Sequence, residues 1–349
     1  MARTDFHPLT VGQVDSLTDD SAAVSFIVPD ELHDVFAFAA GQSLTVRRGD
    51  DRRSYSICAP VGRAPRIGVR EVAGGAVSGW LVHQVRSGDV VEVQAPSGSF
   101  SPDLSKPGQH VLIAAGSGIT PMLSIAGSVL HAHPESTVTL LYGNRRSDTV
   151  MFADDVADLK DSYPARMRLV HVLSREPQEV ELFSGRMDAD KLRQLLPVTV
   201  DIADVDHWWL CGPFGMVTGA IDVLTDLGVE PLRIHRELFY VEEAPPAEVH
   251  HVDAPPGPGA EVTVVLDGRS STVTVGPTEP ILDAAQRVRP DLPFACKGGV
   301  CGTCRALLTN GEVQMRRNYA LEQSEVDAGY VLTCQSLPVS DTVTVDYDS

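Results

Sequence analysis

The sequence lacks long apolar runs. No stretch approaches the roughly 18 uninterrupted apolar residues that a membrane-spanning helix needs. The first residues, Met1-Ala-Arg-Thr-Asp-Phe-His7, contain no apolar signal core. We therefore expect a soluble, cytoplasmic protein that does not bind membranes.

Positive charge is also scarce. The chain has 28 Lys and Arg against 47 Asp and Glu, which gives a formal net charge of -19. This charge repels the phosphates of nucleic acids and anionic lipids, so we expect no nucleic-acid partner. A protein partner is expected to dock through a local patch. Aromatic residues make up only 6% of the chain, but 43% hydrophobic residues suffice for globular cores.

The composition divides the 349 residues into more than one domain. Residues 241–259 hold five prolines, four acidic residues and no lysine or arginine, so they can neither sustain a helix nor bury a core. We interpret them as a linker. Residues 1–104 contain short strand-like runs at 23–28, 43–47 and 90–94, separated by Gly, Asp and Pro, and these predict an antiparallel β-barrel.

Residues 105–240 alternate apolar runs with helical periodicity. The runs lie at 110–115, 138–142, 169–173 and 208–211, and each is followed by a helix or loop. Alternating strands and helices predict a doubly wound α/β domain with a parallel sheet.

Residues 260–349 begin with a hairpin signal. Two runs of alternating β-formers flank Asp267-Gly268. A helix is expected next, with Ile281, Leu282, Ala285 and Val288 on one face.

Cysteine is sparse, but four of the six cysteines are clustered. They follow the pattern Cys296-x4-Cys301-x2-Cys304, with Cys334 after 29 further residues, which is the spacing of plant-type 2Fe-2S ligands. The pattern indicates metal binding in a reducing compartment rather than disulfides. A zinc site and unliganded thiols are the alternatives, although a zinc ribbon normally has two Cys-x2-Cys pairs and this chain has one. The segment resembles a plant-type ferredoxin of the β-grasp fold, which implies a one-electron carrier with a potential of about -400 mV.

A polar motif stands at the end of a predicted barrel strand. Arg53-Ser54-Tyr55-Ser56 resembles the Arg-x-Tyr-Ser signature of the ferredoxin-NADP reductase superfamily. The resemblance implies that Arg53 neutralises the FAD pyrophosphate, that Tyr55 stacks on the isoalloxazine, and that Ser56 hydrogen-bonds near N5. The alternative is an ordinary polar strand end.

Two further segments fall where this superfamily places flavin contacts. The resemblance assigns Val69, Arg70 and Val72 to the side of the ring, and the amides of Gly75, Ala76, Val77 and Ser78 to the pyrophosphate. We expect the nearby Trp80 to be a core residue.

The run at 110–115 leads into Gly116-Ser-Gly118-Ile-Thr120-Pro121. Its sixth position is Pro121, so this is not the Rossmann fingerprint. Glycines allow a tight turn, Thr120 is suited to capping, and Pro121 suits the first position of a helix expected from residue 122 to about 132. The N–H groups of such a helix bind a pyrophosphate. The reductase superfamily has the same Gly-x-Gly-x-Thr-Pro turn.

Other candidate NAD(P)H contacts follow from the same resemblance. Cys211-Gly212-Pro213 is implied to lie by the nicotinamide, with a buried structural cysteine as the alternative. Ser174 and Arg175 match the place where NADP-using members hold the 2'-phosphate, and Arg145 follows a neighbouring strand. An arginine-rich pocket favours NADPH over NADH, unless these arginines are merely solvated.

The end of the nucleotide segment, Arg236-Glu-Leu-Phe-Tyr240, resembles the terminal Glu-x-Phe of the superfamily. Glu237 is then expected at the flavin edge and Phe239 beside the ring. The alternative is a plain edge strand.

Taken together, the modules resemble the reductases of bacterial multicomponent oxygenases. Within this family the most similar groups are the reductases of phenylacetyl-CoA epoxidases and, as a sibling group, those of 3-ketosteroid 9α-hydroxylases. The resemblance implies electron flow from NAD(P)H through FAD and the 2Fe-2S cluster to a terminal oxygenase, with Ser56, Cys211 and Glu237 as catalytic residues. Two other functions stay open: a stand-alone flavin reductase or NADPH oxidase, and a non-catalytic redox carrier.

Overall fold

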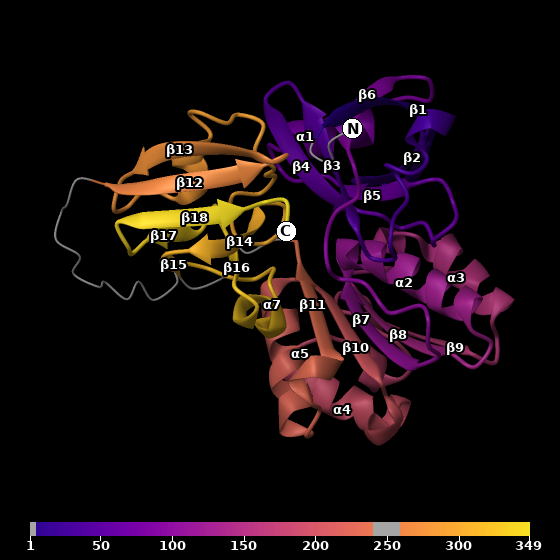
Figure 1. Ribbon diagram of the computed structural model, residues 1–349. Helices are drawn as coiled ribbons and strands as arrows, with labels where there is room; N and C mark the ends of the chain where they lie inside the picture. Colours follow the sequence, from indigo (N-terminus) through magenta and orange to yellow (C-terminus); the bar gives the residue numbers. More distant parts are fainter. Residues whose placement is uncertain (1–4, 240–258) are drawn as a thin grey trace. The chain divides into compact units, whose positions relative to one another are not determined.

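The computed structural model describes residues 5–239 and 259–349. The chain forms two compact units, one built on residues 6–239 and the other on 259–349 (Figure 1). The linker predicted for 241–259 lies, except for Gly259, outside the described residues.

The N-terminal part of the first unit is an antiparallel sheet that closes on itself. Its strands lie in the order β4-β3-β6-β1-β2-β5, and neighbouring strands run antiparallel. An isolated bridge between Ile57 and Ile67 joins the two ends of this order, so a barrel results, as predicted. The elements are β1 (Phe6–Thr18), β2 (Ser21–Ile27), β3 (Ser43–Arg48), β4 (Asp51–Ser56), β5 (Arg66–Arg70), β6 (Val90–Gln94) and helix α1 (Ala76–His83).

The rest of the first unit is a parallel sheet in the order β11-β10-β7-β8-β9, which confirms the predicted α/β fold. The chain adds strands on one side of β7 and then on the other, so the order reverses between β7 and β10. Ligands of doubly wound sheets bind at this switch point. The elements are β7 (Gln109–Ala115), α2 (Ile119–Ala132), β8 (Thr137–Asn144), α3 (Ala153–Ser162), β9 (Met167–Leu173), α4 (Ala189–Thr199), β10 (His207–Gly212), α5 (Phe214–Asp226) and β11 (Ile234–Leu238).

The start of α2 differs from the prediction. A 3-10 turn at Gly116–Gly118 leads directly into the helix, which begins at Ile119 and not at residue 122. Pro121 is therefore the third helical residue, where its missing N–H costs nothing because that group has no partner within the helix. Thr120 does not cap the helix: its hydroxyl donates to the carbonyl of Ser117 (3.0 Å).

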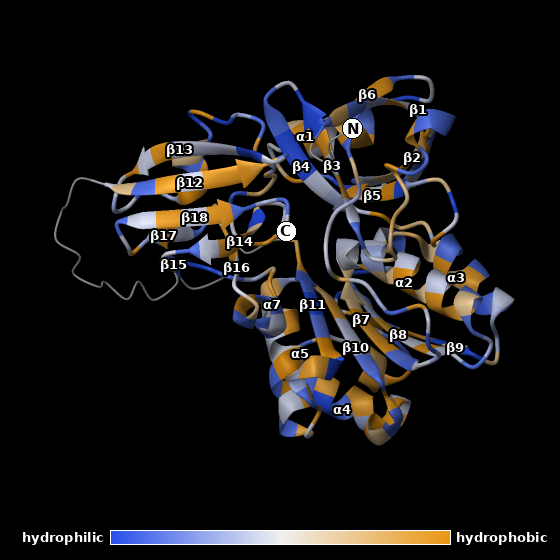
Figure 2. Ribbon diagram, in the orientation of Figure 1, coloured by the Kyte–Doolittle hydropathy of each residue, from blue (hydrophilic) through white to orange (hydrophobic). Residues whose placement is uncertain are grey.

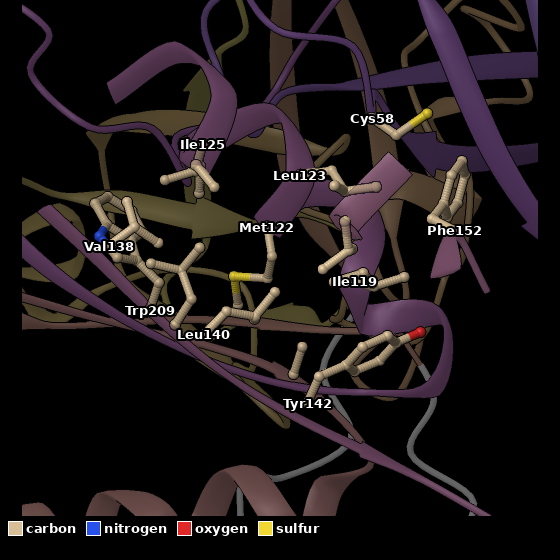
Figure 3. Close-up of a cluster of buried hydrophobic side chains, with 14 of the residues drawn as sticks. Cys58, Ile119, Met122, Leu123, Ile125, Val138, Leu140, Tyr142, Phe152 and Trp209 are labelled. Atoms are coloured by element: carbon tan, nitrogen blue, oxygen red, sulfur yellow. The ribbon is translucent and has the colours of Figure 1, made fainter. Parts of the chain in front are cut away.

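One hydrophobic core contains residues from both parts of the first unit. Ala23, Ala40 and Cys58 of the barrel belong to the same buried cluster as α2 and the inner face of the parallel sheet. Figure 3 shows Cys58 at the same end of this cluster as Leu123 and Phe152. The barrel is thus held to the sheet by apolar burial, at about 25 cal/mol per Å².

The guanidinium of Arg66 adds a polar contact between the barrel and the parallel-sheet part. Arg66 donates to the carboxylate of Asp155 (2.5 Å), and its guanidinium lies 5.3 Å from the centre of the Phe152 ring. There is no room for a side chain at Gly68 of β5, because a Cβ there would lie 2.4 Å from Thr120 and 2.7 Å from Phe152.

The second unit has a mixed sheet in the order β13-β12-β18-β14-β16, with a two-stranded sheet of β15 and β17. The predicted hairpin is present, and Asp267 (φ 52°) and Gly268 (φ 67°) adopt the left-handed conformations that a tight hairpin turn requires. The elements are β12 (Ala260–Leu266), β13 (Arg269–Val275), α6 (Ile281–Ala285), β14 (Arg305–Asn310), β15 (Val313–Met315), α7 (Gln323–Asp327), β16 (Tyr330–Leu332), β17 (Ser336–Pro338) and β18 (Thr342–Asp346).

The predicted apolar face of α6 is only partly correct. Ile281, Leu282 and Ala285 are fully buried, but the helix ends at Ala285 and Val288 is 46% exposed. The chain turns after Ala285, so Val288 no longer follows the helical period.

The hydropathy of the residues differs between the elements of the two units. In Figure 2, helices α4 and α5 show hydrophobic and hydrophilic residues side by side, whereas β4 is mostly hydrophilic. Within 5–239 and 259–349, no helix combines the length and the apolar character needed to cross a bilayer.

Three histidines stack at the end of the parallel sheet where β7, β10 and β11 begin. His110 is buried and accepts a hydrogen bond at Nδ1 from the indole of Trp209 (3.1 Å). Its ring lies 5.1 Å from that of His207, whose Nδ1 is 3.3 Å from Nε2 of His235. Burial, and then the neighbouring His207, lower the pKa of His110 from 6.5 to about 4.

The free energy of unfolding of the first unit should therefore fall between pH 6.5 and pH 4. In this window the unfolded chain takes up a proton at His110 that the folded chain refuses, and this group alone accounts for about 3 kcal/mol. The measurement is urea unfolding followed by tryptophan fluorescence, since Trp80, Trp208 and Trp209 all lie in this unit. We expect His110→Gln to flatten the pH dependence and the exposed control His131→Gln to retain it. An unchanged slope in His110→Gln would contradict the assignment.

Candidate functional site

The nucleotide turn lies directly against the end of β10. A Cβ on Gly118 would lie 2.1 Å from the carbonyl oxygen of Cys211, so only glycine permits this approach. Cys211 is completely buried. The turn Gly116–Gly118 and the segment from Cys211 to Pro213, which the sequence assigns to NAD(P)H, are thus brought together at the switch point of the sheet.

The turn is built to receive an anion. Gly116 has φ +55°, and α2 starts with no side-chain cap and no acidic residue in its first turn. The N–H of Ile119, the first residue of α2, bonds back to Gly116 and Ser117, so the turn Gly116–Gly118 that precedes the helix is the part suited to receive a pyrophosphate. A guanidinium nitrogen of Arg70 lies 3.2 Å from where a Cβ of Gly116 would stand. Arg70, which the sequence predicts beside the flavin ring, is thus placed at the nucleotide turn.

Ser56, Glu237 and Cys211, the three predicted catalytic residues, come from distant segments and meet here. The hydroxyl of Ser56 at the end of β4 donates to a carboxylate oxygen of Glu237 (3.0 Å). Glu237 is the direct neighbour of Cys211 in the parallel pairing of β10 and β11. Loss of water raises the pKa of Glu237 from 4.5 to about 7. Burial, and then the Glu237 charge, raise the pKa of the Cys211 thiol, so this cysteine is neutral and unreactive.

The strand β11 is an edge strand, which the sequence offered as the alternative, and it places Glu237 beside Ser56 and Cys211. Phe239, the predicted neighbour of the flavin ring, is 36% exposed and so is available to a bound group.

The remaining predicted FAD contacts surround the polar strand β4 and the start of α1. Arg53 is half-exposed and 3.8 Å from Asp51, and Tyr55 packs against the barrel core. Helix α1 begins after Gly75 with no side-chain cap and no acidic residue in its first turn. Arg48 donates to the carbonyl of Ala76 in that turn (2.8 Å).

These features fit a bound pyrophosphate, because the uncapped start of α1 and the Arg48 guanidinium lie at the same place. Arg48 was not singled out from the sequence, since an arginine at a strand end carries no distinguishing signal. The other residues predicted to contact FAD differ in how buried their side chains are and in whether they already have hydrogen-bond partners. Val69 and Val77 have side chains buried in the barrel core, Ser78 accepts from the N–H of Val72 (3.1 Å), and Val72 is 50% exposed. Ser54 has its hydroxyl 3.1 Å from that of Thr45.

The loops after β8 and β9 are joined by their backbones. Ser174 N–H donates to the carbonyl of Asn144 (2.9 Å), and Arg175 N–H donates to that of Arg145 (2.8 Å). Arg145 and Arg175 are exposed, and neither side chain has a carboxylate partner within the described part of the chain. Nδ2 of Asn144 is buried without a hydrogen-bond partner there. Two free cations and an unsatisfied donor at one sheet edge fit a polar, anionic nucleotide.

The four clustered cysteines form two pairs. A hydrogen bond between Cys296 and Cys301 is the largest cause of a lowered pKa for Cys296 and a raised pKa for Cys301. Cys334 and Cys304 are related in the same way. Nowhere in 5–239 or 259–349 do three His, Cys, Asp or Glu side chains converge on one metal ion. Two thiol pairs suit a dinuclear iron cluster with two thiolates on each iron.

The surroundings of the pairs also suit thiolates. Gly298 N–H donates to the Cys296 sulfur (3.3 Å), and the side-chain amide of Gln335 lies 3.6 Å from the Cys334 sulfur. Such donors partly offset the negative charge of cluster sulfurs.

A closed β-barrel with an uncapped helix, a doubly wound sheet with a nucleotide turn at its switch point, and paired cysteines in a plant-type loop define an FAD- and 2Fe-2S-dependent NAD(P)H oxidoreductase. Residues 112–222 match the family model of the oxidoreductase NAD-binding domain, and residues 264–339 match that of the 2Fe-2S iron-sulfur cluster binding domain.

Relatives that align over nearly the whole chain show which family of oxidoreductases it belongs to. The chain is 41% identical to a component of the 1,2-phenylacetyl-CoA epoxidase of Escherichia coli (strain K12), with 99% of each chain covered. It is 36% identical to the ferredoxin reductase component of 3-ketosteroid-9-alpha-monooxygenase from Mycobacterium tuberculosis (strain ATCC 25618 / H37Rv), with 97% of this chain and 95% of the relative covered. The chain belongs to the reductase family that includes these proteins.

A solved structure supports the fold. Phthalate dioxygenase reductase matches with a TM-score of 0.59 at 23% identity, with 98% of each chain covered. The order of modules predicted from the sequence is therefore confirmed.

Glu237 should control the pH dependence of flavin reduction. Hydride loss leaves positive charge on the nicotinamide, and the ionised carboxylate stabilises this charge, so the rate should rise as the pH passes about 7. Glu237→Gln retains a hydrogen-bonding group for Ser56 but does not titrate. We expect a flat profile and a rate lower by roughly tenfold at pH 8, equivalent to about 1.4 kcal/mol.

The measurement is anaerobic stopped-flow bleaching of the flavin by NADPH. Glu230→Gln, at an exposed position outside this site, is the matched control and should behave as the wild type. A Glu237→Gln variant that kept the wild-type rise near pH 7 would rule out this role.

Proposed function

We propose that this chain is the reductase component of a multicomponent oxygenase and delivers electrons from NADPH to a terminal oxygenase. The observation that carries the proposal is the junction of Ser56, Glu237 and Cys211 at the switch point, in a chain that also holds two cysteine pairs with plant-type spacing. One polypeptide thus combines a place for hydride transfer with a one-electron carrier.

The chain's own residues bind and orient the reactants. Arg70 and the turn Gly116–Gly118 hold the nucleotide pyrophosphate. Arg48, Arg53 and the start of α1 hold that of FAD, and the four cysteines hold the cluster. When bound, FAD accepts a hydride and passes on single electrons, and the cluster relays them. Ser56 and Glu237 orient the reacting rings and set the local charge. The packing of Cys211 excludes water beside them.

We place the functional boundaries at 1–104 for the FAD barrel, 105–240 for the nucleotide domain, 241–259 for the linker and 260–349 for the ferredoxin domain. The changes in composition and the ranges of the two matched family models support this division.

The preference for NADPH rests on Arg145 and Arg175. Their backbones are linked and their guanidinium groups are exposed. A 2'-phosphate would add charge-assisted hydrogen bonds that NADH does not offer.

For the partner, we propose the oxygenase component of a phenylacetyl-CoA epoxidase. The Escherichia coli relative from such an epoxidase is 41% identical over nearly the whole of both chains, whereas the 3-ketosteroid monooxygenase reductase is 36% identical.

Reconstitution tests the proposed function. With NADPH and the oxygenase of the Escherichia coli phenylacetyl-CoA epoxidase, the chain should support consumption of phenylacetyl-CoA. A 3-ketosteroid 9α-monooxygenase oxygenase tests the sibling partner.

Cys304→Ser removes one cluster thiolate, so it should abolish this activity while ferricyanide reduction by the flavin continues. Cys58→Ala, which removes a buried thiol outside the four, should keep both activities. Loss of ferricyanide reduction in Cys304→Ser would count against two separable redox centres.

Arg175→Ala should reverse the coenzyme preference. Loss of a charge-assisted contact worth about 1.5–3 kcal/mol raises KM for NADPH by roughly 10- to 100-fold and leaves KM for NADH within about twofold. Steady-state ferricyanide reduction with both coenzymes measures this. Arg193→Ala on α4, whose guanidinium pairs with Asp190 and Asp226, is the control. Equal effects on both coenzymes would contradict a 2'-phosphate contact.

A further inference from the structure

The second unit contains three arginines without a carboxylate partner within the described ranges: Arg269 at the β12–β13 turn, and the adjacent pair Arg316 and Arg317. Four basic residues of this unit are ion-paired: Arg287 with Glu279, Arg289 with Asp291, Lys297 with Asp283, and Arg305 with Glu325. Arg316 and Arg317 have no such partner among the residues described. They stand side by side in a protein with a net charge of -19, so this local patch runs against the charge of the whole chain.

The backbone holds these two arginines against the cluster loop. Arg316 N–H donates to the carbonyl of Gln335 (2.9 Å), the residue that follows Cys334, and Tyr319 N–H donates to the carbonyl of Gly299 (3.0 Å). Gly299 has φ +79°, and a Cβ there would lie 3.2 Å from the carbonyl oxygen of Arg317. The segment 316–319 is thus packed on the loop that carries the cysteines.

Other contacts tie the same segment to the fourth cysteine. The amide of Gln335 donates to the carbonyl of Lys297 (2.9 Å) and approaches the Cys334 sulfur. These hydrogen bonds hold the backbone of Arg316 and Arg317 next to the loop that carries the cysteines. The two arginines therefore lie near the cluster from which electrons leave the chain.

We propose that Arg316 and Arg317 form a docking site for an acidic face of the electron-accepting protein. The proposal rests on the proposed function, because it names the surface through which the cluster meets its acceptor. Free cations attract a carboxylate-rich partner over a Debye length of about 8–10 Å. Opposite charges raise association rates and select the orientation that brings two redox centres close. The net charge of -19 repels an acidic partner overall, so a pair of adjacent unpaired cations favours docking beside the cluster loop.

The test uses the full chain loaded with FAD and cluster, and two haem proteins of opposite charge as acceptors. Cytochrome b5 is acidic and cytochrome c is basic. In the variant Arg316→Glu/Arg317→Glu, reduction of cytochrome b5 at low ionic strength should fall by roughly tenfold or more, and reduction of cytochrome c should rise. Added salt should reduce both differences.

Two controls keep the result specific. Arg269→Glu at the β12–β13 turn makes the same kind of charge change at a residue whose backbone is not bonded to the cluster loop, and should have little effect. Arg316→Gln/Arg317→Gln should give an intermediate loss with cytochrome b5. Visible spectra confirm that each variant holds its cluster.

Single-turnover bleaching of the cluster by NADPH separates the competing outcomes. Unchanged bleaching with altered cytochrome rates supports the proposal. Slowed bleaching would show that the arginines serve electron transfer within the chain, and equal cytochrome rates in variant and wild type would show that they bind no acceptor; either result overturns it. Failure of NADPH to bleach the wild-type cluster would instead overturn the proposed function.

Discussion

The hydrogen bond from Ser56 to Glu237 is the contact on which the site depends. It joins the end of a barrel strand to the edge strand of the parallel sheet, 181 residues further along the chain. Hydride transfer requires two rings in contact, so the barrel and the sheet must be held together to within a fraction of an ångström. The shared core around α2 and the Arg66 contact with Asp155 supply that rigidity.

Small residues allow the close approaches around this contact. Gly118 lets the nucleotide turn touch the backbone of Cys211, and Gly68 lets β5 lie against Phe152. A larger residue at Gly118 would push the nucleotide turn away from β10, and one at Gly68 would push the barrel away from Thr120 and Phe152. The site therefore depends as much on missing side chains as on functional groups.

Negative charge is missing, and positive charge is left unpaired, at places where we propose that anions bind. The two helices that are suited to pyrophosphates begin without acidic residues, although the chain as a whole is strongly acidic. In the part of the chain that the structure describes, Arg145 and Arg175 at the predicted 2'-phosphate pocket and Arg316 and Arg317 beside the cluster loop have no carboxylate partner, whereas Arg287, Arg289 and Arg305 are neutralised. An acidic protein can thus hold anionic nucleotides and attract an acidic partner at selected places.

The sequence by itself determined the class of each module. The cysteine spacing predicted the cluster, and the alternation of strands and helices predicted the parallel sheet, because both signals are local and depend on neighbours along the chain. Local signals failed where packing decides: α2 begins three residues earlier than its pattern suggested, and Val288 is exposed because α6 ends before it.

Only the tertiary structure could pair Ser56 with Glu237, place Arg70 at the nucleotide turn, and divide the cysteines into two pairs. It also showed that, among the described residues, Arg316 and Arg317 are free of carboxylates while neighbouring cations are paired. These facts depend on distances between segments far apart in the sequence. Such distances are set by the closure of the barrel, the order of strands and the packing of shared cores, and no pattern along the chain records them.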